Sequence, residues 1–127
     1  MISGGCDMKV FITSAYIPLV DDSLTFEKNL PLPAKKKFGE VLYKLNAKAW
    51  VNDACFSPSG KFAFAGSHNS TLSVIKTDGL ELQTINFSHS PVSKIICLND
   101  ENLIIIGYDR HFYKYSYSNE TKKWYLI

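Results

Sequence analysis

The sequence has no long apolar run and no large net charge. None of the apolar runs in its 127 residues is long enough to cross a bilayer as a helix. The formal charge of +2 is too small to imply a nucleic-acid or membrane partner, and the lysine run Lys35–Lys37 is expected to be a solvated loop. The sequence therefore predicts no membrane and no nucleic-acid partner.

Cysteines are also few, and they are far apart. Cys6, Cys55 and Cys97 form no C-x-x-C pair and have no histidine at ligand spacing, as expected of reduced thiols in a cytosolic protein. The segment Met1–Asp7 lacks the basic and apolar regions of a signal peptide. These features predict a cytoplasmic protein without a structural disulfide.

Motifs for catalysis and for cofactor binding are missing as well. There is no phosphate-binding glycine loop, no zinc-protease motif and no metal-spaced set of carboxylates. Ser57, His68 and Asp53 are near one another in sequence, but we expect them on turns at different ends of strands, without a nucleophile elbow. The sequence predicts no enzyme, no cofactor and no metal.

Short β-branched and aromatic runs, separated by turn residues, fill most of the chain. Such runs are typical of antiparallel strands, and the fold class expected is all-β. Two of them, Ile95–Leu98 and Leu103–Ile106, are apolar throughout and predict strands buried on both faces. The predicted strands are Lys9–Tyr16, Val41–Leu45, Val51–Phe56, Lys61–Ala65, Thr71–Lys76, Leu80–Phe87, Val92–Leu98, Asn102–Ile106, His111–Tyr117 and Lys122–Ile127.

Three turns repeat one pattern, in which an apolar strand ends near a glycine and an Asp or Asn follows. The acidic or amide residues are Asp7, Asn69 and Asp109, whose short side chains can bond the local backbone. Asn69 and Asp109 are 40 residues apart (109 − 69), within the roughly 40–45 residues of a WD-repeat blade. Asp7 and Asn69 are 62 apart (69 − 7), and the proline-containing segment Pro18–Lys37 accounts for the surplus as an inserted loop.

This spacing predicts a partial WD-repeat β-propeller, with two near-complete four-stranded blades and part of a third. His89 resembles the histidine that opens a blade, and we expect it to be structural and to bond Asp109. A complete propeller closes its ring with four to eight blades, so open blade edges on this chain predict self-association. The expected division is 1–17 as the end of one blade, 18–40 as the inserted loop, 41–87 as the second blade and 88–127 as the third.

A set of segments carries a resemblance to a known family, namely Gly4–Val10, Ser14–Ile17, Phe38–Leu42, Trp50–Gly60, Ser67–Val74 and Ile106–Asp109. They resemble subunit 1 of the actin-related protein 2/3 complex, the WD-repeat subunit of an assembly that nucleates branched actin filaments. The resemblance runs from Ser3 to about Tyr117, and Asn69 departs from the family's usual Asp.

The resemblance implies a seven-bladed propeller, with Met1 near the end of the fourth blade, Trp50 in the fifth and Val92 in the sixth. It implies a non-catalytic scaffold at the actin cytoskeleton that binds the other subunits of the complex and, in the full-length protein, actin filaments. The family's segment implicated in actin contact follows the part matched by His111–Ile127, so the resemblance supplies no actin-binding residue. A generic WD-repeat adaptor for another complex is the alternative.

Three aromatic residues, Trp50, Tyr108 and Trp124, are the candidate partner contacts, because buried aromatic anchors dominate protein interfaces. Each of them can instead belong to the core between blades.

Overall fold

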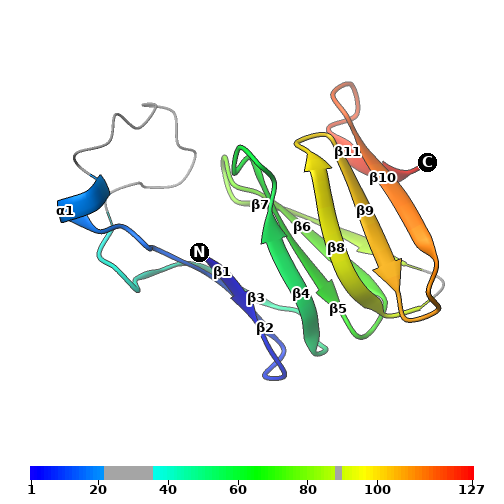
Figure 1. The fold of residues 1–127 in the computed structure, drawn as a ribbon, viewed down its shortest axis with the longest axis horizontal. Helices are drawn as coiled ribbons and strands as arrows, with labels where there is room; N and C mark the ends of the chain where they lie inside the picture. Colours follow the sequence, from blue (N-terminus) through cyan, green and yellow to red (C-terminus); the bar gives the residue numbers. More distant parts are fainter. Residues whose placement is uncertain (22–35, 88–89) are drawn as a thin grey trace.

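The computed structural model describes residues 1–21, 36–87 and 90–127, and these residues form three antiparallel sheets (Figure 1). Sheet 1 has the order β1-β2-β3, sheet 2 the order β4-β5-β6-β7, and sheet 3 the order β11-β10-β9-β8. The elements are β1 Ile2–Gly4, β2 Lys9–Thr13, α1 Pro18–Asp21, β3 Val41–Asn46, β4 Val51–Phe56, β5 Phe62–Ser67, β6 Thr71–Lys76, β7 Glu81–Asn86, β8 Val92–Asn99, β9 Asn102–Gly107, β10 Phe112–Ser118 and β11 Lys123–Leu126.

The prediction of an all-β fold built from four-stranded antiparallel blades is confirmed by sheets 2 and 3. Each sheet is a meander in which consecutive strands pair, joined by short turns. In the β4–β5 turn, Gly60 takes a φ of 77° and its N–H donates to the carbonyl of Ser57 at 2.8 Å. Glycine suits this turn because it adopts positive φ without steric cost.

The predicted boundary between the first and second blades is wrong by one strand. β3 was expected to open the second blade, but it pairs with β2 in sheet 1, with Val10 opposite Leu45. Side-chain burial explains the placement, because Val10 and Leu45 share one face of sheet 1 and pack with Val51 of sheet 2. The insertion therefore lies inside sheet 1, between β2 and β3, and the structure describes α1 and residues 36–40 of it.

The sheets stack in chain order, and the largest core lies between sheets 2 and 3. β5 is buried along its whole length because sheet 1 covers one face of sheet 2 and sheet 3 covers the other. Phe62 and Phe64 of β5 pack edge-on against Trp124 of β11, with ring centroids 5.4 and 5.2 Å apart. Trp124 is only 4% exposed, so its nomination as a partner contact is wrong, because its ring fills the space between sheets.

The expectation that Ile95–Leu98 is buried on both faces is also wrong. Ile95 faces the core and is 3% exposed, whereas Ile96 and Leu98 on the other face of β8 are 42% and 52% exposed. No described element covers this outer face of sheet 3, which also carries Phe112 and Tyr125. The alternation of a strand therefore leaves half of this apolar run at the surface.

Candidate interaction surface

The three turns that repeat in the sequence have the same backbone geometry. The residue after each Asp or Asn, namely Met8, Ser70 or Arg110, has a φ between 61° and 65°. In two of the turns the Asp carboxylate accepts the N–H two residues later, at 3.3 Å for Asp7 and 3.2 Å for Asp109. Asp and Asn favour such turns because a short polar side chain can replace a backbone acceptor.

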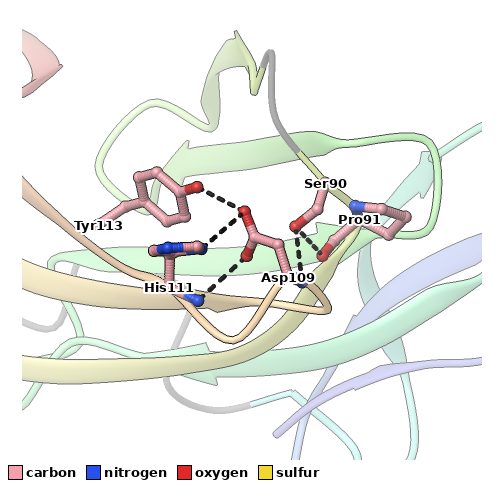
Figure 2. Close-up of polar contacts among 5 residues, drawn as sticks. All are labelled: Ser90, Pro91, Asp109, His111 and Tyr113. Atoms are coloured by element: carbon pink, nitrogen blue, oxygen red, sulfur yellow. Dashed lines mark hydrogen bonds and ion pairs between the residues drawn. The ribbon is translucent and has the colours of Figure 1, made fainter.

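Asp109 holds more partners than its counterparts, and it fixes the β9–β10 turn to the segment that enters β8 (Figure 2). The Tyr113 hydroxyl donates to Asp109 Oδ2 at 2.6 Å, and His111 Nδ1 lies 3.6 Å from the same oxygen. The Asp109 N–H donates to Ser90 Oγ at 3.4 Å. The expected bond from His89 falls outside the residues that the structure describes.

The bond between Tyr113 and Asp109 changes the pKa of both groups. The Tyr113 hydroxyl lowers the pKa of the Asp109 carboxyl, with help from the His111 N–H, because both stabilise the charged form. The same bond raises the pKa of Tyr113 to about 12, because the hydroxyl is the donor. The Asp109 carboxylate is therefore ionised at neutral pH, and its hydrogen bonds have a structural role in this turn.

Because Asp109 is ionised more easily in the folded chain, its contribution to stability depends on pH. The contribution is present above the unfolded pKa of about 3.9 and is lost as pH falls through the lower folded value. We expect Asp109→Asn to lower the urea midpoint at neutral pH, and the difference from the parent chain to shrink in acid. In a Tyr113→Phe background, the effect of Asp109→Asn on the urea midpoint should depend less on pH. If the effect of Asp109→Asn on the parent chain stayed constant through the acid range, this assignment would be contradicted.

The start of β4, the β5–β6 turn and the β9–β10 turn lie at one end of the stack, along the lower edge of the sheets in Figure 1, and each carries an exposed side chain with an aromatic ring. Trp50 precedes β4, His68 lies in the β5–β6 turn and Tyr108 lies in the β9–β10 turn. The ring of His68 is 5.7 Å from that of Trp50 and 5.5 Å from that of Tyr108, measured between centroids. Trp50 and Tyr108 are 55% and 56% exposed. We call these three residues the aromatic surface.

Backbone bonds hold the aromatic surface in place. The His68 N–H donates to the carbonyl of Trp50 at 2.8 Å, and the Tyr108 N–H donates to the carbonyl of Pro91 at 3.1 Å. Asn52 Nδ2 lies 3.3 Å from His68 Nδ1 and also donates to the carbonyl of Val92 at 2.8 Å. With Nδ1 as the acceptor, the proton of a neutral His68 ring is on Nε2. The rings are therefore positioned before any partner arrives, which reduces the entropy lost on binding.

An open hollow of about 360 Å³ adjoins the aromatic surface on the side of sheet 1. Its lining is largely apolar and consists of Met8, Ala49, Trp50, His68 and Asn69. A shallow, largely apolar hollow beside exposed rings can accommodate a side chain of another protein.

Two of the three predicted partner contacts, Trp50 and Tyr108, thus lie on one surface, and His68 joins them. From the sequence, His68 was a candidate only for a catalytic group with Ser57 and Asp53, and not for a partner contact. A signal for its position was present, since His68 and Tyr108 both directly precede the Asp or Asn of a repeated turn, 40 residues apart (108 − 68). Equivalent positions in stacked repeats lie side by side, and this predicts the contact.

The structure does not assemble Ser57, His68 and Asp53 into a catalytic group. Ser57 follows β4 and His68 follows β5, and because these strands are antiparallel the two residues lie at opposite ends of sheet 2. Six strand residues separate those ends by roughly 20 Å. Asp53 is engaged elsewhere, with the Lys94 ammonium and the Ile95 N–H.

Among residues 1–21, 36–87 and 90–127, no cluster of three or more His, Cys, Asp or Glu is placed to hold a metal ion. No helix in the described part of the chain has the length and apolarity needed to span a membrane.

Comparison with known proteins gives a matching family description, "WD domain, G-beta repeat", over residues 39–76. This match begins before β3 of sheet 1 and ends with β6 of sheet 2. The sequence repeat is therefore offset by one strand from the sheet, which agrees with the corrected position of β3.

The chain is also similar to curated relatives from a frog and a fission yeast. It is 28% identical over 113 residues to actin-related protein 2/3 complex subunit 1A-B of Xenopus laevis, covering 86% of this chain and 30% of that protein. It is 28% identical over 119 residues to actin-related protein 2/3 complex subunit 1 of Schizosaccharomyces pombe, again with 86% and 30% covered. The chain thus spans about a third of the length of these relatives. It carries a WD repeat and is distantly homologous to subunit 1 of the actin-related protein 2/3 complex over most of its length.

Proposed function

We propose that this chain is part of a non-catalytic scaffold subunit of an actin-related protein 2/3 complex, which supports nucleation of branched actin filaments through protein–protein contacts. The observation that carries the proposal is the distant similarity to subunit 1, which extends over 86% of the chain in relatives from both a vertebrate and a fungus. WD repeats are typically non-catalytic, which agrees with this role. A protein with this role would act in the cytoplasm, at the actin cytoskeleton.

The aromatic surface is the contact that we propose for a neighbouring subunit. It combines exposed rings with a preformed apolar hollow, and aromatic side chains dominate the binding energy of most interfaces. His68 adds a ring N–H at the centre of the surface, which can donate to a carbonyl or carboxylate of the partner.

The outer face of sheet 3 is the surface that we propose for the expected self-association of the isolated chain. Ile96, Leu98 and Phe112 expose 42%, 52% and 73% of their surface there. Two copies that stack through this face would remove these apolar side chains from water.

The experiment is co-purification of the tagged chain, with the bound proteins identified by mass spectrometry. We expect recovery of actin-related proteins 2 and 3, and a loss of recovery of roughly tenfold or more when Trp50 and Tyr108 are replaced by alanine. The loss follows from removing two exposed rings that a partner would bury. Circular dichroism should show an unchanged fold, because neither side chain belongs to a core cluster.

A matched control is Phe38→Ala, which removes a 64% exposed ring from the opposite end of sheet 1, beside the bond between the Gly39 N–H and the Ser14 carbonyl. This control should leave recovery unchanged. Recovery of a different set of proteins would favour the generic WD-repeat adaptor. If the actin-related proteins were recovered equally well after Trp50 and Tyr108 are replaced by alanine, the proposed scaffold function would stand and the proposed contact would be contradicted.

A further inference from the structure

The first strands of sheets 2 and 3, β4 and β8, are joined by hydrogen bonds to aspartate side chains at two levels, one along the strands and one beyond their far ends. Near the start of the strands, Asp53 Oδ2 accepts the N–H of Ile95 at 2.7 Å. Beyond their far ends, the Ser59 N–H donates to Asp100 Oδ1 at 3.1 Å. Bonds to backbone N–H groups at both levels fix the distance between the two strands.

Two cysteines face each other between these levels. The sulfur atoms of Cys55 on β4 and Cys97 on β8 are 3.4 Å apart, although the residues are 42 positions apart in the sequence. Both are half-buried against the core between sheets 2 and 3. A disulfide has a sulfur–sulfur distance of about 2.05 Å, so the two atoms need to approach by roughly 1.4 Å. The sequence spacing predicted three separate thiols, and the stacking of the sheets brings two of them into contact.

The two thiols are chemically unequal. Their shared hydrogen bond raises the pKa of Cys55 and lowers the pKa of Cys97, whereas burial alone raises both. Cys97 therefore loses its proton first, and the thiolate is the reactive form of a cysteine. Cys55 stands beside it as the protonated partner.

We propose that Cys55 and Cys97 form a reversible disulfide across the seam between sheets 2 and 3 when the protein meets hydrogen peroxide. The Cys97 thiolate attacks one peroxide oxygen, the O–O bond breaks, and the other oxygen takes up a proton and leaves as water. The Cys55 thiol then loses its proton, its sulfur attacks the Cys97 sulfenic acid, and the S–O bond breaks with release of a second water. Two thiols are oxidised and one peroxide is reduced to two waters.

The consequence is a covalent link between neighbouring sheets that are otherwise held by packing, hydrogen bonds and the ion pair between Lys94 and Asp53. Cys6 lies in the β1–β2 turn, is exposed, and has neither of the other cysteines as a neighbour in the described structure. Oxidised Cys6 has no neighbouring thiol within the chain with which to form a disulfide. Cys6 is therefore an internal reference for the oxidation of Cys55 and Cys97. The proposal does not depend on the proposed function.

The test is peptide mapping of the 127-residue chain after brief exposure to hydrogen peroxide, alkylation and digestion with trypsin without reduction. Lys48 and Lys61 bracket Cys55, and Lys94 and Arg110 bracket Cys97, so the bridge links peptide 49–61 to peptide 95–110. We expect this linked pair to be the main disulfide product. When the chain is oxidised in urea, the yield of this pair relative to pairs that contain Cys6 should fall by roughly tenfold or more. The reason is that folding supplies the high effective concentration of one thiol near the other.

Single serine variants separate the roles of the two sulfurs. Cys55→Ser should leave a sulfenic acid at Cys97 that dimedone traps, and Cys97→Ser should leave Cys55 largely unoxidised. Intermolecular disulfides through Cys6 as the main product, or equal yields of the linked peptides in folded and urea-treated chain, would overturn the proposal.

Discussion

Replacing Trp124 by alanine should lower the free energy of unfolding by about 3–5 kcal/mol, the range for deleting a buried aromatic side chain. The ring is 4% exposed and contacts Phe62 and Phe64 of sheet 2 edge-on. Its backbone is fixed as well, because the Trp124 N–H donates to Gln83 Oε1 at 3.0 Å and Gln83 Nε2 donates to the Trp124 carbonyl at 3.2 Å. Alanine would keep these bonds and leave a cavity between the sheets.

The measurement is urea unfolding followed by circular dichroism, since tryptophan fluorescence changes with the substitution itself. Trp50→Ala is the matched control, because it removes the other tryptophan from a 55% exposed site and should change stability by only about 0.5 kcal/mol. Trp124→Phe should cost less than alanine, because it keeps an aromatic ring and removes a buried indole N–H without a partner among the described residues. Equal costs for Trp124→Ala and Trp50→Ala would contradict the placement of Trp124 in the core.

Replacing Gly66 by alanine should cost about 2–3 kcal/mol, near the top of the usual range for overpacking. A Cβ atom at Gly66 would lie 2.3 Å from Val92 Cγ1 and 2.8 Å from Val92 Cβ. Val92 is fully buried and β-branched, so it cannot rotate away. Sheets 2 and 3 would have to move apart, which loosens the core between them. Urea midpoints measure the effect.

Gly5→Ala is the control, because the nearest atom to its added Cβ is Asp7 Oδ1 at an ordinary 3.5 Å. Val92→Ala should be less costly in the Gly66→Ala chain than in the parent chain, because it removes the methyl groups that clash. Additive costs for Gly66→Ala and Val92→Ala would show that the two positions do not meet across the seam.

The candidate site was predictable in part. The repeated turn pattern identified Asp7, Asn69 and Asp109, and the structure gives all three turns the same positive φ at the next residue. Turns of this kind are encoded locally, by side chains that bond the backbone within two residues. Exposure is not encoded locally, and so Trp50 and Trp124 were equal candidates in the sequence although one is a surface residue and the other a core residue.

The sequence by itself determined the strands, the turns, the repeat period and the all-β blade architecture, because these follow from patterns within a few residues or from the spacing of equivalent turns. The tertiary structure alone decided which sheet received β3, which face of β8 met the core, and which thiols came into contact. The physical reason is that side chains alternate along a strand, so that each strand has two faces. Each sheet can therefore pack against a neighbouring sheet on either face. Only stacking selects the face that is buried, and it places Cys55 against Cys97 and His68 between Trp50 and Tyr108.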